Sequence, residues 1–389
     1  MCAFSLSRLG GVGLALLLLG GCVKPYNAPV PDAAKSYLVV DGFVNLNGPS
    51  TFRLSRTLGL AASTPVSESK ATVSIKDEAG NSYPLSERPA GTYTYAPRTA
   101  LDSTRRYQLH VVTSGNKEYQ SDLVESQRTP PIDTISWKYT GDGVQIAVSA
   151  HGAPGRPTTY YRWDYRETWR YTSAFYSHLF YDKTMQELVQ RNDDIYNCWG
   201  TVNSSTINLG NTAALAQDVL TNQPLLFIPN KSVRLRIRYS ILVMQYGQTA
   251  DEYRYWEALK KNTESIGSLY DALPTQLTGN IHALADPAEP VLGYVGAHSV
   301  RAHRIYIDRN ELPLPFAWPF ETGYESCSRI PIEFSPFDAK AEFSTPNYLP
   351  IDPIYAADGV TIKGYLGAPT SCVDCRSQGG DNLRPSFWY

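Results

Sequence analysis

Cys22 is the residue whose surroundings most clearly predict a chemical modification. It follows Arg8, a short apolar stretch from Leu9 onward, and the small residues Gly20-Gly21. An apolar stretch of this length is too short to span a bilayer and is typical of a cleaved export signal. The residues before Cys22 resemble a lipobox, so we predict removal of residues 1–21 and a lipid on the Cys22 thiol. An ordinary secretory signal with a chance cysteine is the alternative.

Four further cysteines could form disulfides, because an exported chain meets an oxidising compartment. Cys372-Val373-Asp374-Cys375 is a Cys-x-x-Cys motif, which in a cytosolic chain would suggest zinc binding or redox chemistry. No second such motif exists, and no thioredoxin-like βαβ pattern surrounds this one. Three pairings are open. We prefer the one that joins Cys372 and Cys375 outward to Cys198 and Cys327, which would tie the C-terminal segment to the domain. A metal site, catalytic redox work and free thiols are the alternatives.

Residues 159–172 alternate between aromatic and charged side chains. A period of two sends the two sets to opposite faces of a β-sheet. The aromatic face is interpreted as the core of a sandwich, and an aromatic platform for a sugar or peptide is the alternative. The aromatic set is Tyr161, Trp163, Tyr165, Trp169 and Tyr171, and the charged set is Arg162, Asp164, Arg166 and Arg170.

A second alternating stretch runs from Val233 to Val243 and is expected to be one strand. Its outward positions would be Arg234, Arg236 and Arg238. Solvated arginines beside carboxylates explain this pattern. An anion-binding or partner-binding stripe is the alternative.

Motifs of the common enzyme classes are absent from the sequence. It contains no Gly-x-Ser-x-Gly, His-Glu-x-x-His, Walker or Gly-x-Gly-x-x-Gly motif. Its histidines are scattered, and His298 and His303 are spaced for neither one helix face nor one strand face. We therefore expect no catalytic residue, no metal and no cofactor. A hydrolase with carboxylates brought together only by folding stays open.

Composition favours a β-rich fold and argues against a nucleic-acid binder. The 389 residues include 27 Tyr, 7 Trp, 28 Gly and 27 Pro, and aromatic residues separated by turn formers are typical of all-β domains. The 35 Lys and Arg against 37 Asp and Glu leave a net charge of −2, whereas phosphate contacts need a basic excess.

The elements that would position these residues fall into two domains after a tether over residues 22–35. Residues 36–128 contain short, regularly spaced strand patterns, and the stretch around Tyr107 resembles the tyrosine corner of immunoglobulin-like sandwiches. Pro130-Pro131 ends this domain, because proline cannot donate a ladder hydrogen bond. The prediction is an immunoglobulin-like or fibronectin type III-like sandwich.

The second domain, residues 132–389, is predicted to be a larger β-sandwich with helical insertions at about 180–230 and 249–270. Helices are expected at Lys183–Arg191, Asn211–Leu220 and Thr249–Lys261, the last with Thr249 and Glu252 as a capping box. From Leu312 onward, prolines and aromatics predict a long extended tail. Phe387 and Trp388 are expected to dock on the protein's own surface.

Several stretches together resemble the exported Bacteroidota lipoproteins known as domain of unknown function 4249. The resemblance spans nearly the whole chain after Cys22. The stretches that carry it are Tyr239-Ser240-Ile241-Leu242-Val243, Gly267-Ser268-Leu269-Tyr270-Asp271, Gln276-Leu277-Thr278-Gly279-Asn280-Ile281, Glu289-Pro290-Val291-Leu292-Gly293-Tyr294 and Cys372-Val373-Asp374-Cys375-Arg376.

The resemblance implies an outer-membrane lipoprotein encoded near TonB-dependent transporters, and it supplies no catalytic residues. We expect a non-enzymatic accessory component that binds a glycan or peptide ligand, or a TonB-dependent β-barrel, and that is held to the outer membrane by its lipid. Whether it faces the cell surface or the periplasm is left open. A surface adhesion or envelope-structural lipoprotein is the alternative.

Overall fold

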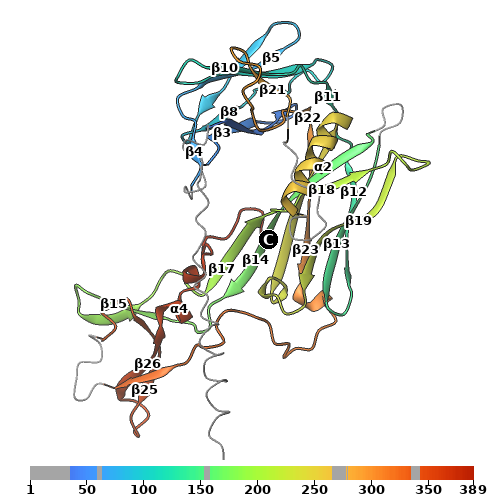
Figure 1. Ribbon diagram of the computed structural model, residues 1–389. Coiled ribbons are helices and arrows are strands. Elements are labelled where there is room, and N and C mark those ends of the chain that lie inside the picture. Colours follow the sequence, from blue (N-terminus) through green and yellow to red (C-terminus); the bar gives the residue numbers. More distant parts are fainter. Residues whose placement is uncertain (1–35, 59–63, 153–157, 265–276, 278, 334–341) are drawn as a thin grey trace, which may run out of the picture.

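The computed structural model describes residues 36–58, 64–152, 158–264, 277, 279–333 and 342–389 (Figure 1). The predicted export signal, the tether and Cys22 lie outside the described residues. The described chain is mainly β and is built from several antiparallel sheets.

Two five-stranded sheets form the first sandwich. Strands β3 (Ser50–Arg56) and β9 (Tyr107–Val112) bury alternate residues, so each sheet presents an apolar face to the other. Phe52 and Tyr107 are among the fully buried residues of this core. One sheet contains β1 (Leu38–Gly42), β3 (Ser50–Arg56), β4 (Val66–Ser67), β7 (Ser86–Glu87) and β8 (Thr92–Tyr95). The other contains β5 (Thr72–Asp77), β6 (Ser82–Pro84), β9 (Tyr107–Val112), β10 (Glu118–Ser121) and β21 (Ile281–Ala283).

The predicted tyrosine corner is present at Tyr107. Its hydroxyl donates a hydrogen bond of 2.9 Å to the main-chain oxygen of Asp102, five residues back. Burial raises the pKa of Tyr107 to about 12. This contact is a hallmark of immunoglobulin-like sandwiches, and with the two packed sheets it supports that fold class for the first domain.

Residues 279–298 return from the second part of the sequence into the first sandwich. Strand β21 pairs with β10, and β22 (Ala297–His298) pairs in parallel with both β2 (Val44–Asn45) and β11 (Ser126–Gln127). Gly293 has φ +125°, and a Cβ there would lie 2.0 Å from the Val40 oxygen. The sequence assigned this segment to the second domain, because its partners lie far away in the chain.

The second sandwich packs a three-stranded sheet against a five-stranded one. Strand β14 (Tyr160–Thr172) is central. It pairs with β17 (Asn197–Asn203) and β18 (Asn208–Asn211) on one side and with β20 (Arg238–Gln248) on the other. The first sheet contains β12 (Ile132–Tyr139), β13 (Gly143–His151) and β19 (Val219–Pro229). The second contains β14 (Tyr160–Thr172), β17 (Asn197–Asn203), β18 (Asn208–Asn211), β20 (Arg238–Gln248) and β23 (Val300–Asp308).

One of the three predicted helices forms. Helix α2 (Ala250–Glu264) begins after Thr249, whose hydroxyl accepts a hydrogen bond of 3.2 Å from the Glu252 N–H. Lys183–Arg191 instead belongs to the hairpin of β15 (Leu179–Asp182) and β16 (Glu187–Gln190). Asp182 accepts hydrogen bonds from the main chain two and three residues on, so turn chemistry overrides the helical spacing. Asn211–Leu220 is also not helical, because β18 and β19 occupy its ends.

The C-terminal part contains a sheet that the sequence did not predict. Strands β24 (Ile330–Glu333), β25 (Tyr348–Tyr355) and β26 (Ile362–Pro369) pair, and α4 (Thr370–Val373) and the 3-10 helix η4 (Cys375–Gln378) follow. Ile351, Ala368 and Val373 pack with Ile195 into a small separate core. Residues 379–389 then run without a helix or a named strand to the outer face of the second sandwich (Figure 1).

A buried cluster of charged and aromatic side chains joins the two sandwiches. His298 and Glu252 are both buried, with Nε2 and Oε1 3.4 Å apart. Phe43 stacks on His298 at 4.3 Å, and the Arg162 guanidinium lies 4.1 Å from the ring centre of Trp256. Removing one member of a buried polar pair leaves the other buried without its partner, so this joint depends on both Glu252 and His298.

Removing the tyrosine-corner hydroxyl tests the first sandwich. Tyr107→Phe should lower the free energy of unfolding by about 1 kcal/mol, because one buried hydrogen bond is lost while the ring remains. Tyr95→Phe is the matched control in the same sandwich. Thermal unfolding followed by calorimetry measures both, and equal midpoints for the two variants would contradict the assignment.

The joint should make stability depend on pH. Burial alone would raise the pKa of Glu252, but His298 and Arg162 outweigh it and the pKa is lowered. The stabilisation is therefore complete above the ordinary glutamate pKa and is lost as pH falls through the lowered value. Glu252→Gln should be less stable at neutral pH and should lose this part of the acid dependence.

The control for this experiment is Glu257→Gln, which removes an exposed carboxylate of the same helix that pairs with Lys261 at 3.7 Å. Unfolding midpoints are measured from neutral pH downward for both variants and the unchanged protein. An unaltered pH profile for Glu252→Gln would show that the pair does not contribute.

Candidate ligand-binding site

Three of the predicted aromatic face residues lie in the core of the second sandwich. Tyr161 and Trp163 are 0% exposed and Tyr165 is 6% exposed. The Trp163 indole donates to Gln245 Oε1 at 2.8 Å, inside the protein. The core interpretation is therefore confirmed for these three residues, and the alternative of an aromatic platform is wrong for them.

Trp169 lies on the same strand face but reaches the end of the core, where it is only partly buried. The guanidinium of Arg234 lies 5.1 Å from its ring centre. Arg234 also contacts both carboxylate oxygens of Glu167 at 3.0 Å. Two of the predicted site residues, from separate parts of the sequence, are thus brought together.

Glu167 is the buried carboxylate that holds the Arg234 guanidinium in place. It is 3% exposed and accepts a further hydrogen bond of 2.8 Å from the Tyr239 hydroxyl. Burial raises its pKa, and Arg234 and Tyr239 only partly offset that effect. Its contacts hold the Arg234 guanidinium in a defined position beside Trp169.

The predicted arginine stripe does not form. Arg234 lies in the 3-10 helix η2 (Val233–Leu235), Arg236 is its C-cap, and β20 starts only at Arg238. Ser232 caps η2 by accepting from the Arg234 N–H, which turns the chain away from a strand. Arg236 donates to Thr172 Oγ1, whereas Arg238 pairs with Asp308, so the three arginines have separate surroundings.

A pocket of about 330 Å³ opens beside Trp169, and we call it the Trp169 pocket. Strand β17 contributes Gly200 and Val202, and η2 contributes Arg234. The C-terminal segment Gln378–Gly380 forms another wall, so distant parts of the chain build one hollow. The Trp169 ring can lie this close to β17 because residue 200 is a glycine. A Cβ at Gly200 would lie 2.4 Å from the ring.

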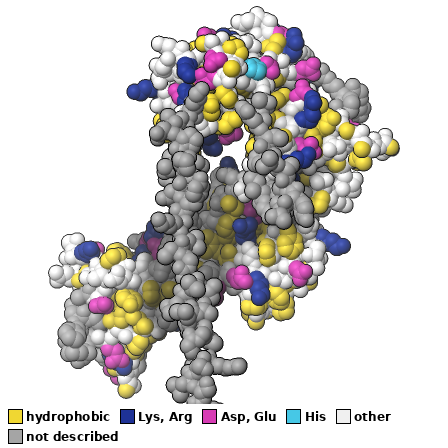
Figure 2. All heavy atoms as spheres, viewed as in Figure 1, with side chains coloured by type: hydrophobic (Ala, Val, Ile, Leu, Met, Phe, Trp, Pro, Cys, Tyr) yellow, Lys and Arg dark blue, Asp and Glu magenta, His cyan; other side chains and the backbone are white. Residues whose placement is uncertain are grey.

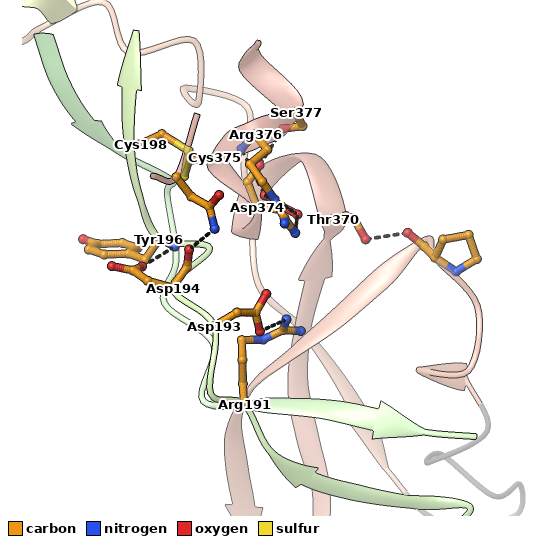
Figure 3. A network of polar contacts seen from close by, with 12 residues as sticks. Arg191, Asp193, Asp194, Tyr196, Cys198, Thr370, Asp374, Cys375, Arg376 and Ser377 are labelled. Carbon is orange, nitrogen blue, oxygen red and sulfur yellow. Dashed lines mark hydrogen bonds and ion pairs between the residues drawn. A yellow bond between two sulfur atoms is a disulfide. The ribbon is translucent and has the colours of Figure 1, made fainter. Parts of the chain in front are cut away.

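Two disulfides hold the C-terminal segment against the sandwich. Cys198 bonds to Cys375 and Cys327 to Cys372, so both cysteines of the motif pair outward as the sequence predicts. Figure 3 shows the first bond beside Asp374 and Arg376, which form an ion pair of 2.6 Å. The disulfides therefore fix the segment that supplies a wall of the Trp169 pocket.

The last residues dock on the protein's own surface. Trp388 is 6% exposed and packs edge-on against Trp199 and Tyr306. Tyr306 donates a hydrogen bond of 2.5 Å to the Phe387 oxygen. The predicted docking of Phe387 and Trp388 is confirmed, although only Trp388 is deeply covered.

The chemistry available in the Trp169 pocket is recognition. An indole ring offers an apolar face, while Arg234, Gln378 and Thr322 offer hydrogen-bonding groups around it. Among the described residues, no cluster of three or more His, Cys, Asp or Glu could hold a metal ion. No helix in the described ranges is long and apolar enough to cross a membrane.

Comparison with known proteins gives one family. The family model "Domain of unknown function (DUF4249)" matches residues 23–304. No functionally curated protein matches the sequence. Residues 305–389, which include both cysteines of the Cys-x-x-Cys motif, lie beyond the matched range.

Two solved structures show distant likenesses. A two-domain fibronectin type III segment of chicken tenascin is 9% identical over 54% of this chain and 91% of its own, with a TM-score of 0.16. The BSP domain of a biofilm-associated protein is 8% identical over 88% of this chain and 80% of its own, also with a TM-score of 0.16. Likenesses at this level do not identify a function.

Removing the long-range disulfide tests the tail's attachment. In a Cys198→Ser/Cys375→Ser variant, the segment after residue 375 should become sensitive to protease, and unfolding should be easier by about 2–5 kcal/mol. The control is Cys327→Ser/Cys372→Ser, which leaves the Cys198–Cys375 bond in place. Peptide mapping without reductant identifies the bonds in the unchanged protein, and four free thiols would refute the arrangement.

Proposed function

This chain belongs to the DUF4249 family, and from that premise we propose that it is a non-enzymatic lipoprotein of the outer membrane, an accessory ligand- or partner-binding component of a TonB-dependent uptake system. Lipid on Cys22 and the tether over residues 22–35 would hold the two sandwiches at the membrane. The family resemblance supports the association with a transporter.

The observation that carries the proposal is the Trp169 pocket. Its walls come from β14, β17, η2 and the C-terminal segment, and a disulfide ties that segment in place. A pocket whose walls are fixed before binding loses less conformational entropy when a ligand enters. An aromatic ring beside a guanidinium, an amide and a hydroxyl suits a sugar residue, with its apolar ring face and its hydroxyls.

The direct test is recovery of tagged protein from its native membrane in gentle detergent, followed by mass spectrometry. We expect a TonB-dependent barrel in stoichiometric amount. A Cys22→Ser variant is the control for anchoring, and it should leave the membrane fraction. Recovery of the tagged protein alone would contradict the uptake proposal and favour the surface-adhesion alternative.

The Trp169 pocket is tested separately by screening glycans and peptides against the lipid-free mature chain. Trp169→Ala should abolish binding of any ligand that occupies the pocket. Phe316→Ala removes a fully exposed ring elsewhere and is the matched control, since it should leave binding unchanged. Equal binding by both variants would remove this pocket from the proposal.

A further inference from the structure

The face of the second sandwich opposite the core carries a second set of arginines. Alternation along β14 sends Arg162, Arg166 and Arg170 to this side, away from Trp163 and Trp169. Arg304 on β23 lies on the same face. Strands β14 and β23 lie near the centre of the molecule in Figure 1, and Figure 2 shows basic and acidic side chains interspersed with hydrophobic ones on the surface from the same side.

Strand register places Arg166 and Arg304 in one row across the sheet. Arg166 is paired with Leu242 of β20, and Leu242 is paired with Arg304 of β23. Their Cα atoms are therefore two strand spacings apart, roughly 10 Å. Asn203 of β17 extends the row on the other side of Arg166. Long arginine side chains can converge on one ligand over this span.

Each of these two guanidiniums is positioned by a neutral neighbour. Arg166 Nε donates to Asn203 Oδ1 at 2.9 Å, and Arg304 Nη1 donates to Ser240 Oγ at 3.0 Å. Arg304 also lies over the Phe387 ring at 3.6 Å, so the docked C-terminal segment steadies it. The side chains are oriented without being neutralised.

On this face Arg162 and Arg238 have carboxylate partners, and Arg170 donates to the Asn197 amide oxygen. Within the described ranges, Arg166 and Arg304 have no carboxylate partner. Arg162 lies 3.6 Å from Asp164 and Arg238 lies 3.2 Å from Asp308. Burial lowers the pKa of Arg304, and the nearby positive Arg166 acts in the same direction. The repulsion between two positive charges held on one row is relieved when an oxyanion binds between them.

The surrounding groups favour a sugar-borne acid over an acidic peptide. The main chain of β14 is already paired with β17 and β20, and that of β20 with β14 and β23, so a peptide cannot insert as a strand between Arg166 and Arg304. In the next row Thr201 is exposed and presents a hydroxyl, whereas Thr168 and Ser240 are fully buried. The Thr201 hydroxyl and the Asn203 amide beside the arginines match the hydroxyls and the acid group of an acidic sugar.

We propose that Arg166 and Arg304 form a binding site for the acidic group of an anionic oligosaccharide, either a uronate carboxylate or a sulfate ester. The site lies on the sheet face opposite the Trp169 pocket. It goes beyond the proposed function, because it would serve an adhesion protein as well as an uptake component.

Calorimetric titration of the mature chain tests this site with three probes: an oligogalacturonate, a heparin-derived sulfated oligosaccharide and neutral maltohexaose. We expect at least one anionic probe to bind at low salt. Its affinity should fall as salt is added, because exposed charges are screened. Maltohexaose should not compete with it. Binding by the oligogalacturonate alone would identify a uronate, and binding by the sulfated probe alone a sulfate.

The variants for this titration are Arg166→Gln, Arg304→Gln and the pair together. Each single change should lower the affinity for the anionic probe about tenfold, since charge-assisted hydrogen bonds are lost. Arg→Lys at either position should weaken it less, because the charge remains. Arg98→Gln removes an exposed arginine of the first sandwich and should have no effect, and Trp169→Ala should also leave this site intact.

Three results would overturn the inference. The first is that neither anionic probe binds the unchanged protein. The second is that the double variant binds as well as the unchanged protein, and the third is that Arg98→Gln weakens binding as much as Arg166→Gln. In the first of these cases, poly-glutamate that binds through the same arginines would identify an acidic peptide as the ligand instead. Unfolding midpoints of all variants confirm that they are folded.

Discussion

The two-residue period of strand β14 is the constraint on which the rest of the second sandwich depends. Because this strand is paired on both sides, its side chains can point only into the core or out of it. Tyr161 and Trp163 fill the core, whereas Arg162 and Arg166 face outward. One strand therefore supplies the core packing, part of the joint to the first sandwich and the arginines of the sheet's outward face. A shift by one residue would exchange all of these roles.

The second constraint is that distant segments must meet. Residues 279–298 return to the first sandwich and bring His298 to Glu252 of α2, so the joint closes only when both sandwiches are folded. At the other end, the Cys198–Cys375 bond spans 177 residues and places the tail against β17. Non-local contacts of this kind build the Trp169 pocket, whose walls come from distant parts of the sequence.

Local patterns in the sequence were enough to predict features that depend on neighbouring residues. The alternation on β14, the tyrosine corner at Tyr107 and the cap at Thr249 are all set by residues within a few positions of one another. The cysteines were also informative, because an isolated Cys-x-x-Cys left few partners. The core assignment of Tyr161 and Trp163 followed from alternation alone.

Features set by distant contacts or by turn chemistry were not predicted. Met185, Leu188 and Val189 have helical spacing, but Asp182 closes a hairpin turn before them. Arg234 and Arg236 alternate like a strand, but the Ser232 cap starts a 3-10 helix. The placement of Arg166 and Arg304 in one row was missed. It depends on the register of β20 with both neighbouring strands, which the sequence does not reveal. The parity of Arg166 opposite Trp163 was the one available signal.

The central claim is that the outward face of β14 recognises an anionic ligand, whereas its inward face packs in the core except at Trp169, which lines the Trp169 pocket. Arginine-specific footprinting with phenylglyoxal, read by mass spectrometry with and without an anionic oligosaccharide, tests this most directly. The account predicts modification of Arg166 and Arg304 in the free protein and their protection by the ligand, with exposed Arg98 modified equally in both states. Equal modification of all three arginines with and without the ligand would contradict it.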